Sequence, residues 1–159
     1  MEALLEETAL TLARHAGPDF VVERCQDPDD VLYLARLWKG RGYAIVRLDL
    51  HGHGAGGEFK LGDGLLFASD GTGYELAREL GPTLAPKADV RLLGCRTATE
   101  GVFAKADGKK RSGAKLLRDL TRLLGGGRRV WGTTGYLGPR DLEASGLSRR
   151  ASRRLLRTA

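Results

Sequence analysis

The stretches YAIVRLDLHGHG (residues 43–54) and DVRLLGC (residues 89–95) decide the predicted fold. Both are rich in aliphatic and β-branched residues, a composition typical of buried strands in a parallel sheet. Each stretch ends abruptly, the first at HGHGAGG and the second at Cys95. Because segments with helical spacing alternate with these strands, the sequence predicts an α/β fold. We expect a mostly parallel sheet covered by helices on both faces, which is a three-layer α-β-α sandwich.

The remaining segments supply the other helices and strands. Asp27 and Pro28 form the start signal of a helix that should end near Gly40. The segment EFKLGDGLLFAS favours a hairpin with Asp63 and Gly64 at its turn. Further helices are predicted at residues 3–15, 74–84 and 114–124, and further strands at residues 20–22 and 128–134.

Length and composition predict a single domain that spans residues 1–159. Its arginine-rich tail, from about residue 145, should form a solvated helix. The chain has no apolar run long enough to span a membrane and no basic leader, so a cytoplasmic protein is expected. Cys25 and Cys95 are too few for a disulfide framework and lack the spacing of a zinc site. The sequence therefore predicts two free thiols, no metal and no cofactor.

Charge is distributed unevenly along the chain. The net charge of +6 divides into −6 for residues 1–79, with 8 basic and 14 acidic side chains, and +12 for residues 80–159, with 18 and 6. A basic half can attract nucleic acid, inositol phosphates or an acidic protein. Because aromatic residues are not interleaved with the basic ones, a nucleic-acid partner is not expected, and a solvated surface is the simpler interpretation.

Two reactive side chains stand at strand ends that should share one edge of the sheet. In parallel α/β sheets, reactive groups gather beyond the carboxyl ends of the strands. Cys95 is a candidate nucleophile, and His53 is its candidate partner, because a thiolate is stabilised by an imidazole and an amine leaving group needs a proton. The backbone amides of Gly54 and Cys95 are candidate donors to an oxyanion. The pattern predicts a Cys-His dyad.

The order of these motifs resembles the caspase-like fold of the clan CD cysteine peptidases. The chain has a strand ending in HG, then GEFKLG, then a strand ending in GCRTA. This order is similar to that of bacterial branches of the family, which include CHAT-type domains, and the resemblance covers residues 19–135. The resemblance implies a cysteine endopeptidase acting on a peptide or protein substrate, with His53 and Cys95 as its catalytic pair. His51 also precedes a glycine and competes with His53, although only His53 gives the family's glycine spacing. His51 and Thr97 are candidate substrate contacts.

The chain departs from the family pattern at two places. The first central strand of the family is missing, so an upstream domain, a partner protein or a different element is expected to complete the sheet. The segment LLG before Cys95 includes no acidic side chain, so the preference for the residue before the scissile bond stays open. The segment ADGKKRSGAK lies where family members have a processed loop, and self-cleavage is predicted near Lys109, Lys110 or Arg111.

Other function classes fit less well or stay open. An α/β-hydrolase is excluded because neither a GxSxG nor a GxCxG elbow is present. A nucleotide-binding fold is unsupported because no nucleotide-binding glycine motif follows a strand and opens a helix. A catalytically inactive caspase-like module that binds a partner or regulates is one alternative, since fold alone does not determine function. A second alternative is an inositol-phosphate-triggered autoprocessing domain similar to those of large bacterial toxins, which the basic half would suit.

Overall fold

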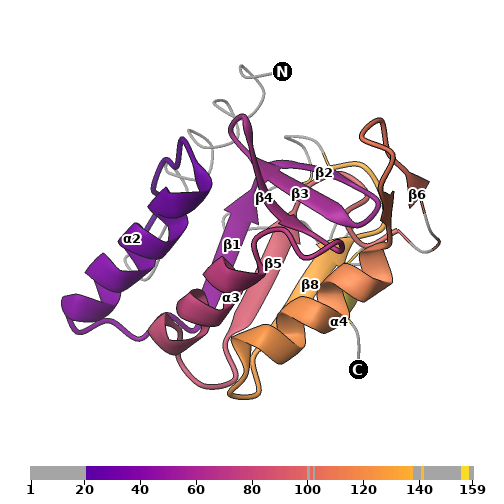
Figure 1. Cartoon of the computed structure of the whole chain (residues 1–159). Coiled ribbons are helices and arrows are strands. Elements are labelled where there is room, and N and C mark those ends of the chain that lie inside the picture. Colours follow the sequence, from indigo (N-terminus) through magenta and orange to yellow (C-terminus); the bar gives the residue numbers. More distant parts are fainter. Residues whose placement is uncertain (1–20, 100, 102, 138–140, 142–154, 158–159) are drawn as a thin grey trace.

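The computed structural model describes residues 21–99, 101, 103–137, 141 and 155–157. In these residues the chain is a mixed α/β protein with a main sheet, a second sheet and helices (Figure 1). The helix predicted at residues 3–15, Phe20 and the tail over residues 145–154 lie outside the described residues. No helix in the described part of the chain is long and apolar enough to cross a membrane.

The main sheet contains the three longest strands predicted from the sequence. β1 (Arg47–His51), β5 (Asp89–Leu93) and β8 (Arg129–Thr133) run parallel in the order β1-β5-β8. A fourth strand, β9 (Leu155–Arg157), pairs antiparallel with β8. The parallel strands therefore end at one edge of the sheet, as the sequence predicts.

Three predictions at this sheet need correction. The strand predicted from Tyr43 begins only at Arg47. Val21 and Val22, predicted as strand residues, belong to no strand and are 53% and 39% exposed, because β propensity alone supplies no neighbouring strand to pair with. The tail was expected to be helical, but its residues 155–157 form β9, where they gain backbone pairing along β8.

The second sheet is antiparallel and follows directly from β1. It contains β2 (His53–Ala55), β3 (Glu58–Leu61) and β4 (Gly64–Ala68) in the order β2-β3-β4. The predicted hairpin is confirmed and gains one strand, but its turn lies at Gly62 and Asp63 rather than at Asp63 and Gly64, because Gly64 already pairs with Leu61. The chain passes from one sheet to the other by a bend at Gly52. A Cβ there would lie 2.1 Å from the carbonyl oxygen of Lys60, so only glycine fits.

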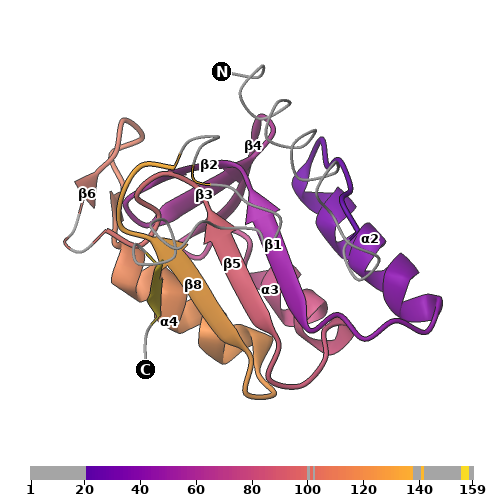
Figure 2. The same cartoon turned by 180° about the vertical axis from the view of Figure 1, so that it is seen from behind.

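The described helices lie together on one face of the main sheet (Figures 1 and 2). They are α2 (Pro28–Gly40), α3 (Tyr74–Leu80), which continues into the 3-10 turn η1 (Gly81–Thr83), and α4 (Gly113–Leu124). The predicted helix start is confirmed, because the side chain of Asp27 accepts hydrogen bonds from two backbone amides of the first turn of α2.

Side chains alternate across the main sheet. The face toward the helices carries buried aliphatic residues, among them Leu50, Val90 and Val130. The opposite face carries an ion pair between Arg91 Nε and Asp49 Oδ1, 2.6 Å apart, on paired positions of β5 and β1. We expected uniformly buried strands, but RLDLH and DVRLL alternate with the period of a sheet that has one apolar face. The second helix layer of the predicted sandwich is not among the described elements.

A short hairpin occupies the polar segment that follows Cys95. β6 (Phe103–Ala104) and β7 (Lys110–Arg111) pair antiparallel, although the sequence predicts an open, processed loop here. Lys109 and Lys110 are exposed, whereas Arg111 is only 5% exposed. Because a protease must reach the side chain before the cleaved bond, the fold does not support cleavage after Arg111, and the prediction is kept for the two lysines.

Candidate active site

His53 and Cys95 lie where the parallel strands of the main sheet end. Cys95 follows β5 in a turn, and His53 opens β2 just after the bend that ends β1. Since β1 and β5 are paired neighbours, with His51 opposite Leu93, both candidate residues leave the sheet at the same edge. The strand ends therefore bring the two segments together, as the sequence predicts.

The backbones of these two segments are in direct contact. A Cβ built on Gly54 would lie 2.2 Å from Thr97 Oγ1 and 2.8 Å from the carbonyl oxygen of Cys95. A Cβ built on Gly94 would lie 2.8 Å from the amide nitrogen of Gly54 and 3.0 Å from the carbonyl carbon of His53. Real Cβ atoms do not approach other atoms so closely, so both positions require glycine. The two glycines set the backbone of His53 against the backbone of Cys95.

The turn that carries Cys95 is held on several sides; we call residues 94–98 the nucleophile turn, after the role predicted for Cys95. Arg96 lies in the left-handed region, with φ of 55°, and its amide donates to the Gly135 carbonyl at 2.8 Å. The amide of Ala98 donates to the Thr133 carbonyl at 2.8 Å. The hydroxyl of Thr133 donates to the carbonyl of Gly94. A non-glycine residue in this conformation costs about 1 kcal/mol or more, and such strain clusters at functional sites.

The Cys95 side chain is half-buried, and its thiol contacts the carbonyl oxygen of Leu137 at 3.8 Å. No hydrogen bond joins it to the ring of His53. Catalytic hydrogen bonds are often long or poorly aligned before substrate binds, so this geometry leaves the pair intact as a candidate. In the described part of the chain, the Cys95 amide donates to no other backbone group. That amide is therefore available as a donor to an oxyanion.

The two histidines occupy different environments, although both precede a glycine. His51 ends β1 and lies level with Leu93, whereas His53 belongs to β2 and the second sheet. Burial lowers the pKa of His51, the nearby Asp49 carboxylate partly opposes that effect, and Arg91 adds to it. We expected both residues on one extended segment, but a bend at Gly52 places them in two different strands. His51 as a substrate contact remains a prediction.

Thr97 has a structural role that differs from the one predicted. It is fully buried, and its hydroxyl donates to the carbonyl of Gly94 at 3.2 Å. The carbonyl of Thr97 accepts a hydrogen bond from the Gly57 amide at 3.2 Å. The hydroxyl is engaged within the protein, and the prediction of a substrate contact by Thr97 stays a prediction. Thr97 stabilises the nucleophile turn and fastens it to the second sheet.

The second cysteine lies in an unreactive environment. Burial raises the pKa of the Cys25 thiol to about 11, and the carboxylates of Asp30, Glu23 and Asp27 add to the shift. A thiol with so high a pKa is protonated at neutral pH and is a poor nucleophile. Within the described residues, no group of histidine, cysteine and carboxylate side chains has the arrangement of a metal site.

Sequence reasoning missed three features of the site. The left-handed φ of Arg96 and the contact of the thiol with Leu137 have no sequence signal that could have shown them. The third feature is Arg111, a charged residue in a polar segment that is nevertheless buried beside the site. The alternation of charges and glycines in ADGKKRSG indicates a turn, but it does not indicate which charge is buried.

No protein-family model matches the chain, and neither the curated proteins nor the solved structures searched gave a match. The likeness of the motifs around His53 and Cys95 to clan CD peptidases therefore stays a prediction from the sequence.

Proposed function

We propose that the chain is a caspase-like cysteine endopeptidase in which Cys95 is the nucleophile and His53 the general acid and base. One observation carries the proposal: the Gly54 and Gly94 backbones touch, and this contact sets His53 beside Cys95 at the carboxyl edge of a parallel sheet. Reactive groups of open α/β sheets gather at this edge. A thiol and an imidazole held there have the two functions that peptide hydrolysis needs.

The proposed reaction uses each group in turn. His53 takes the thiol proton as Cys95 Sγ attacks the carbonyl carbon of the substrate, and the amides of Gly54 and Cys95 donate to the resulting oxyanion. His53 then protonates the amine as the C–N bond breaks, which leaves a thioester on Cys95. Water, deprotonated by His53, cleaves the thioester and releases the acid with the free thiol. No cofactor takes part in these steps.

The same proposal includes the three-layer arrangement predicted from the sequence. The charged face of the main sheet lies opposite the described helices, yet the side chains of Arg91 and Asp49 there are only 12% and 16% exposed. Ion pairs so well shielded favour a further layer over this face. Hydrogen exchange of the β5 amides in the full chain tests it, because fast exchange would mean an uncovered face.

The test of the activity compares wild type with Cys95→Ala, His53→Ala and His51→Ala. A thiol-reactive peptide probe should label Cys95 in the wild type, and a mixed peptide library read by mass spectrometry should show cleavage. Loss of cleavage in Cys95→Ala and His53→Ala, with cleavage retained in His51→Ala, supports the dyad. A wild type that neither labels nor cleaves contradicts the proposal.

A non-catalytic caspase-like module is the second candidate, and two observations favour it. The thiol of Cys95 contacts Leu137 rather than His53. Among the described strands, none pairs with the outer edge of β1, where Tyr43 and Val46 nearby are 60% and 66% exposed. Such an edge can accept a strand from an upstream domain or a partner protein. An inactive wild type with normal folding would favour this function.

A further inference from the structure

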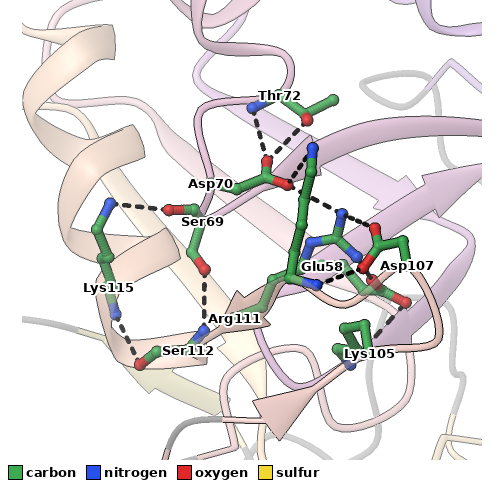
Figure 3. Close-up of polar contacts among 10 residues, drawn as sticks. Glu58, Ser69, Asp70, Thr72, Lys105, Asp107, Arg111, Ser112 and Lys115 are labelled. Atoms are coloured by element: carbon green, nitrogen blue, oxygen red, sulfur yellow. Dashed lines mark hydrogen bonds and ion pairs between the residues drawn. The ribbon is translucent and has the colours of Figure 1, made fainter.

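The buried guanidinium of Arg111 is surrounded by carboxylate side chains (Figure 3). Arg111 is 5% exposed, and its Nη1 lies 2.7 Å from Glu58 Oε2. Its Nη2 lies 3.0 Å from Asp70 Oδ2 and 2.7 Å from Asp107 Oδ2. The three carboxylates come from β3, from the segment after β4 and from the turn of the β6–β7 hairpin. One cation thus joins the second sheet to the hairpin that follows the nucleophile turn.

The backbone beside this guanidinium touches both halves of the candidate site. A Cβ on Gly57, next to β2, would lie 2.4 Å from the amide nitrogen of Ser112 and 2.9 Å from the carbonyl carbon of Arg111. A Cβ on Gly113 would lie 2.5 Å from the carbonyl carbon of Ala98 in the nucleophile turn. Residues 111–113 are therefore packed between the sheet that carries His53 and the turn that carries Cys95.

The carboxylate partners extend this arrangement toward the histidine. Glu58 pairs in register with Ala55 at the end of β2, the strand that His53 opens. Ser69, which precedes Asp70, accepts a hydrogen bond from the Ser112 amide at 2.9 Å, and its amide donates to the Gly57 carbonyl at 2.9 Å. Any shift of Arg111 would therefore be transmitted to β2 through backbone contacts.

We propose that Arg111 is a positioning residue that sets the His53 strand against the nucleophile turn. This inference rests on the proposed function, because it concerns the alignment of the same two side chains. The planar guanidinium presents a fixed fork of donors and can hold three carboxylates at defined angles, which an ammonium cannot do. Without it, Lys105 still faces Glu58 and Lys109 still faces Asp70, but the one group that contacts all three carboxylates is gone, and the hairpin moves away from β3. A misplacement of about 1 Å can cost a reaction about 100-fold in rate.

The experiment measures how strongly His53 affects the alkylation of Cys95. Iodoacetamide labelling of Cys95, read on its own peptide by mass spectrometry, is followed over about pH 5 to 9. The wild type, His53→Ala, Arg111→Met and the double variant form a cycle. In Arg111→Met, the rate at neutral pH should fall by about 10 to 100-fold, and the added His53→Ala substitution should have no further effect. Arg111→Lys should rescue only part of the rate.

The control is Arg128→Met, which removes a partly buried arginine at the opposite end of the sheet. Arg128 donates to the carbonyls of Leu84, Leu124 and Gly125, so its loss destabilises the fold without touching the site. Arg128→Met should leave the effect of His53→Ala on the alkylation rate of Cys95 unchanged. If Arg111→Met does not fold, Asp107→Asn serves instead, because this carboxylate is 43% exposed and contributes one contact to the same guanidinium. A smaller change in the same direction is expected.

The outcomes separate the two levels of the proposal. If His53→Ala changes the alkylation of wild-type Cys95 but the change persists undiminished in Arg111→Met, the positioning role is refuted and the dyad stands. If His53→Ala has no effect on Cys95 in the wild type, the dyad itself fails, and the positioning role is refuted with it. If Arg128→Met removes the dependence as fully as Arg111→Met, the effect is one of general stability and the inference is refuted.

Discussion

Gly54→Ala places one methyl group at the contact between the His53 strand and the nucleophile turn. The new Cβ would lie 2.2 Å from Thr97 Oγ1 and 2.8 Å from the carbonyl oxygen of Cys95. Thr97 is fully buried and donates to Gly94, so its hydroxyl cannot turn away without losing that hydrogen bond. Overpacking of this kind costs about 1–3 kcal/mol, and the lost hydrogen bond adds about 1 kcal/mol.

The expected loss of stability is therefore about 2–4 kcal/mol. For a chain of this size, such a loss lowers the melting temperature by roughly 5–15 °C. The two segments must also separate to admit the methyl group, so peptide cleavage and Cys95 labelling should fall by about 100-fold. Thermal unfolding by circular dichroism measures the first effect, and labelling measures the second.

Gly40→Ala is the matched control. Nothing lies within 4 Å of a Cβ at Gly40, which is the last residue of α2, so the same chemical change should leave stability unchanged or raise it by up to about 1 kcal/mol. If Gly54→Ala melts at the temperature of wild type, the two backbones are not in contact in solution, and the reasoning is refuted whether or not the chain is a peptidase.

Three further predictions concern the rest of the fold. Burial alone would raise the pKa of Asp70, but hydrogen bonds from Thr72, Arg111 and Lys109 hold it below its usual range. The ionised Asp70 therefore stabilises the fold above the unfolded-state pKa of about 3.9, and this stabilisation is lost as the pH falls below that value. Asp70→Asn should show a smaller decrease of the urea midpoint between about pH 5 and 3 than the wild type. A decrease as steep as that of the wild type would contradict this. Arg96→Gly relieves a φ of 55° and should raise the melting temperature by roughly 2–4 °C, whereas a decrease would mean that the side-chain contact with Tyr136 outweighs the strain. Asp27→Ala removes the cap of α2 and should cost about 1 kcal/mol in guanidinium denaturation, and an unchanged midpoint would exclude the cap as a stabilising contact.

The long elements were predictable because their signals are local. The cap at Asp27 and the amphipathic repeat of α4 each lie within one segment, and both helices form as predicted. β5 was found from its aliphatic residues, and β8 was predicted over residues 128–134 as the strand that follows the helix at residues 114–124. The single apolar face of the main sheet was also predictable, since polar and apolar residues alternate in β1 and β5. Greater weight on that alternation would have corrected the expectation of strands that are apolar on both faces.

The short elements could not be predicted because their partners lie elsewhere in the chain. β2 is a strand only because β3 pairs with it, and β9 only because β8 offers an edge. The pairing of strand ends that brings His53 near Cys95 followed from the parallel topology. The burial of Arg111 could not be predicted in this way, because it depends on carboxylates that come from three separate segments. A run of charges is ordinarily solvated, so the sequence favours the wrong environment for this residue.

The contact between Gly54 and Gly94 has a consequence for finding relatives of this chain. The spacing between the histidine and the cysteine is set there by two main chains without side chains between them. A search that requires only a histidine and a cysteine would admit chains that cannot bring the two together. HG and GC should instead be read as one signature, split between two strand ends, in which each glycine is as diagnostic as the histidine or cysteine beside it.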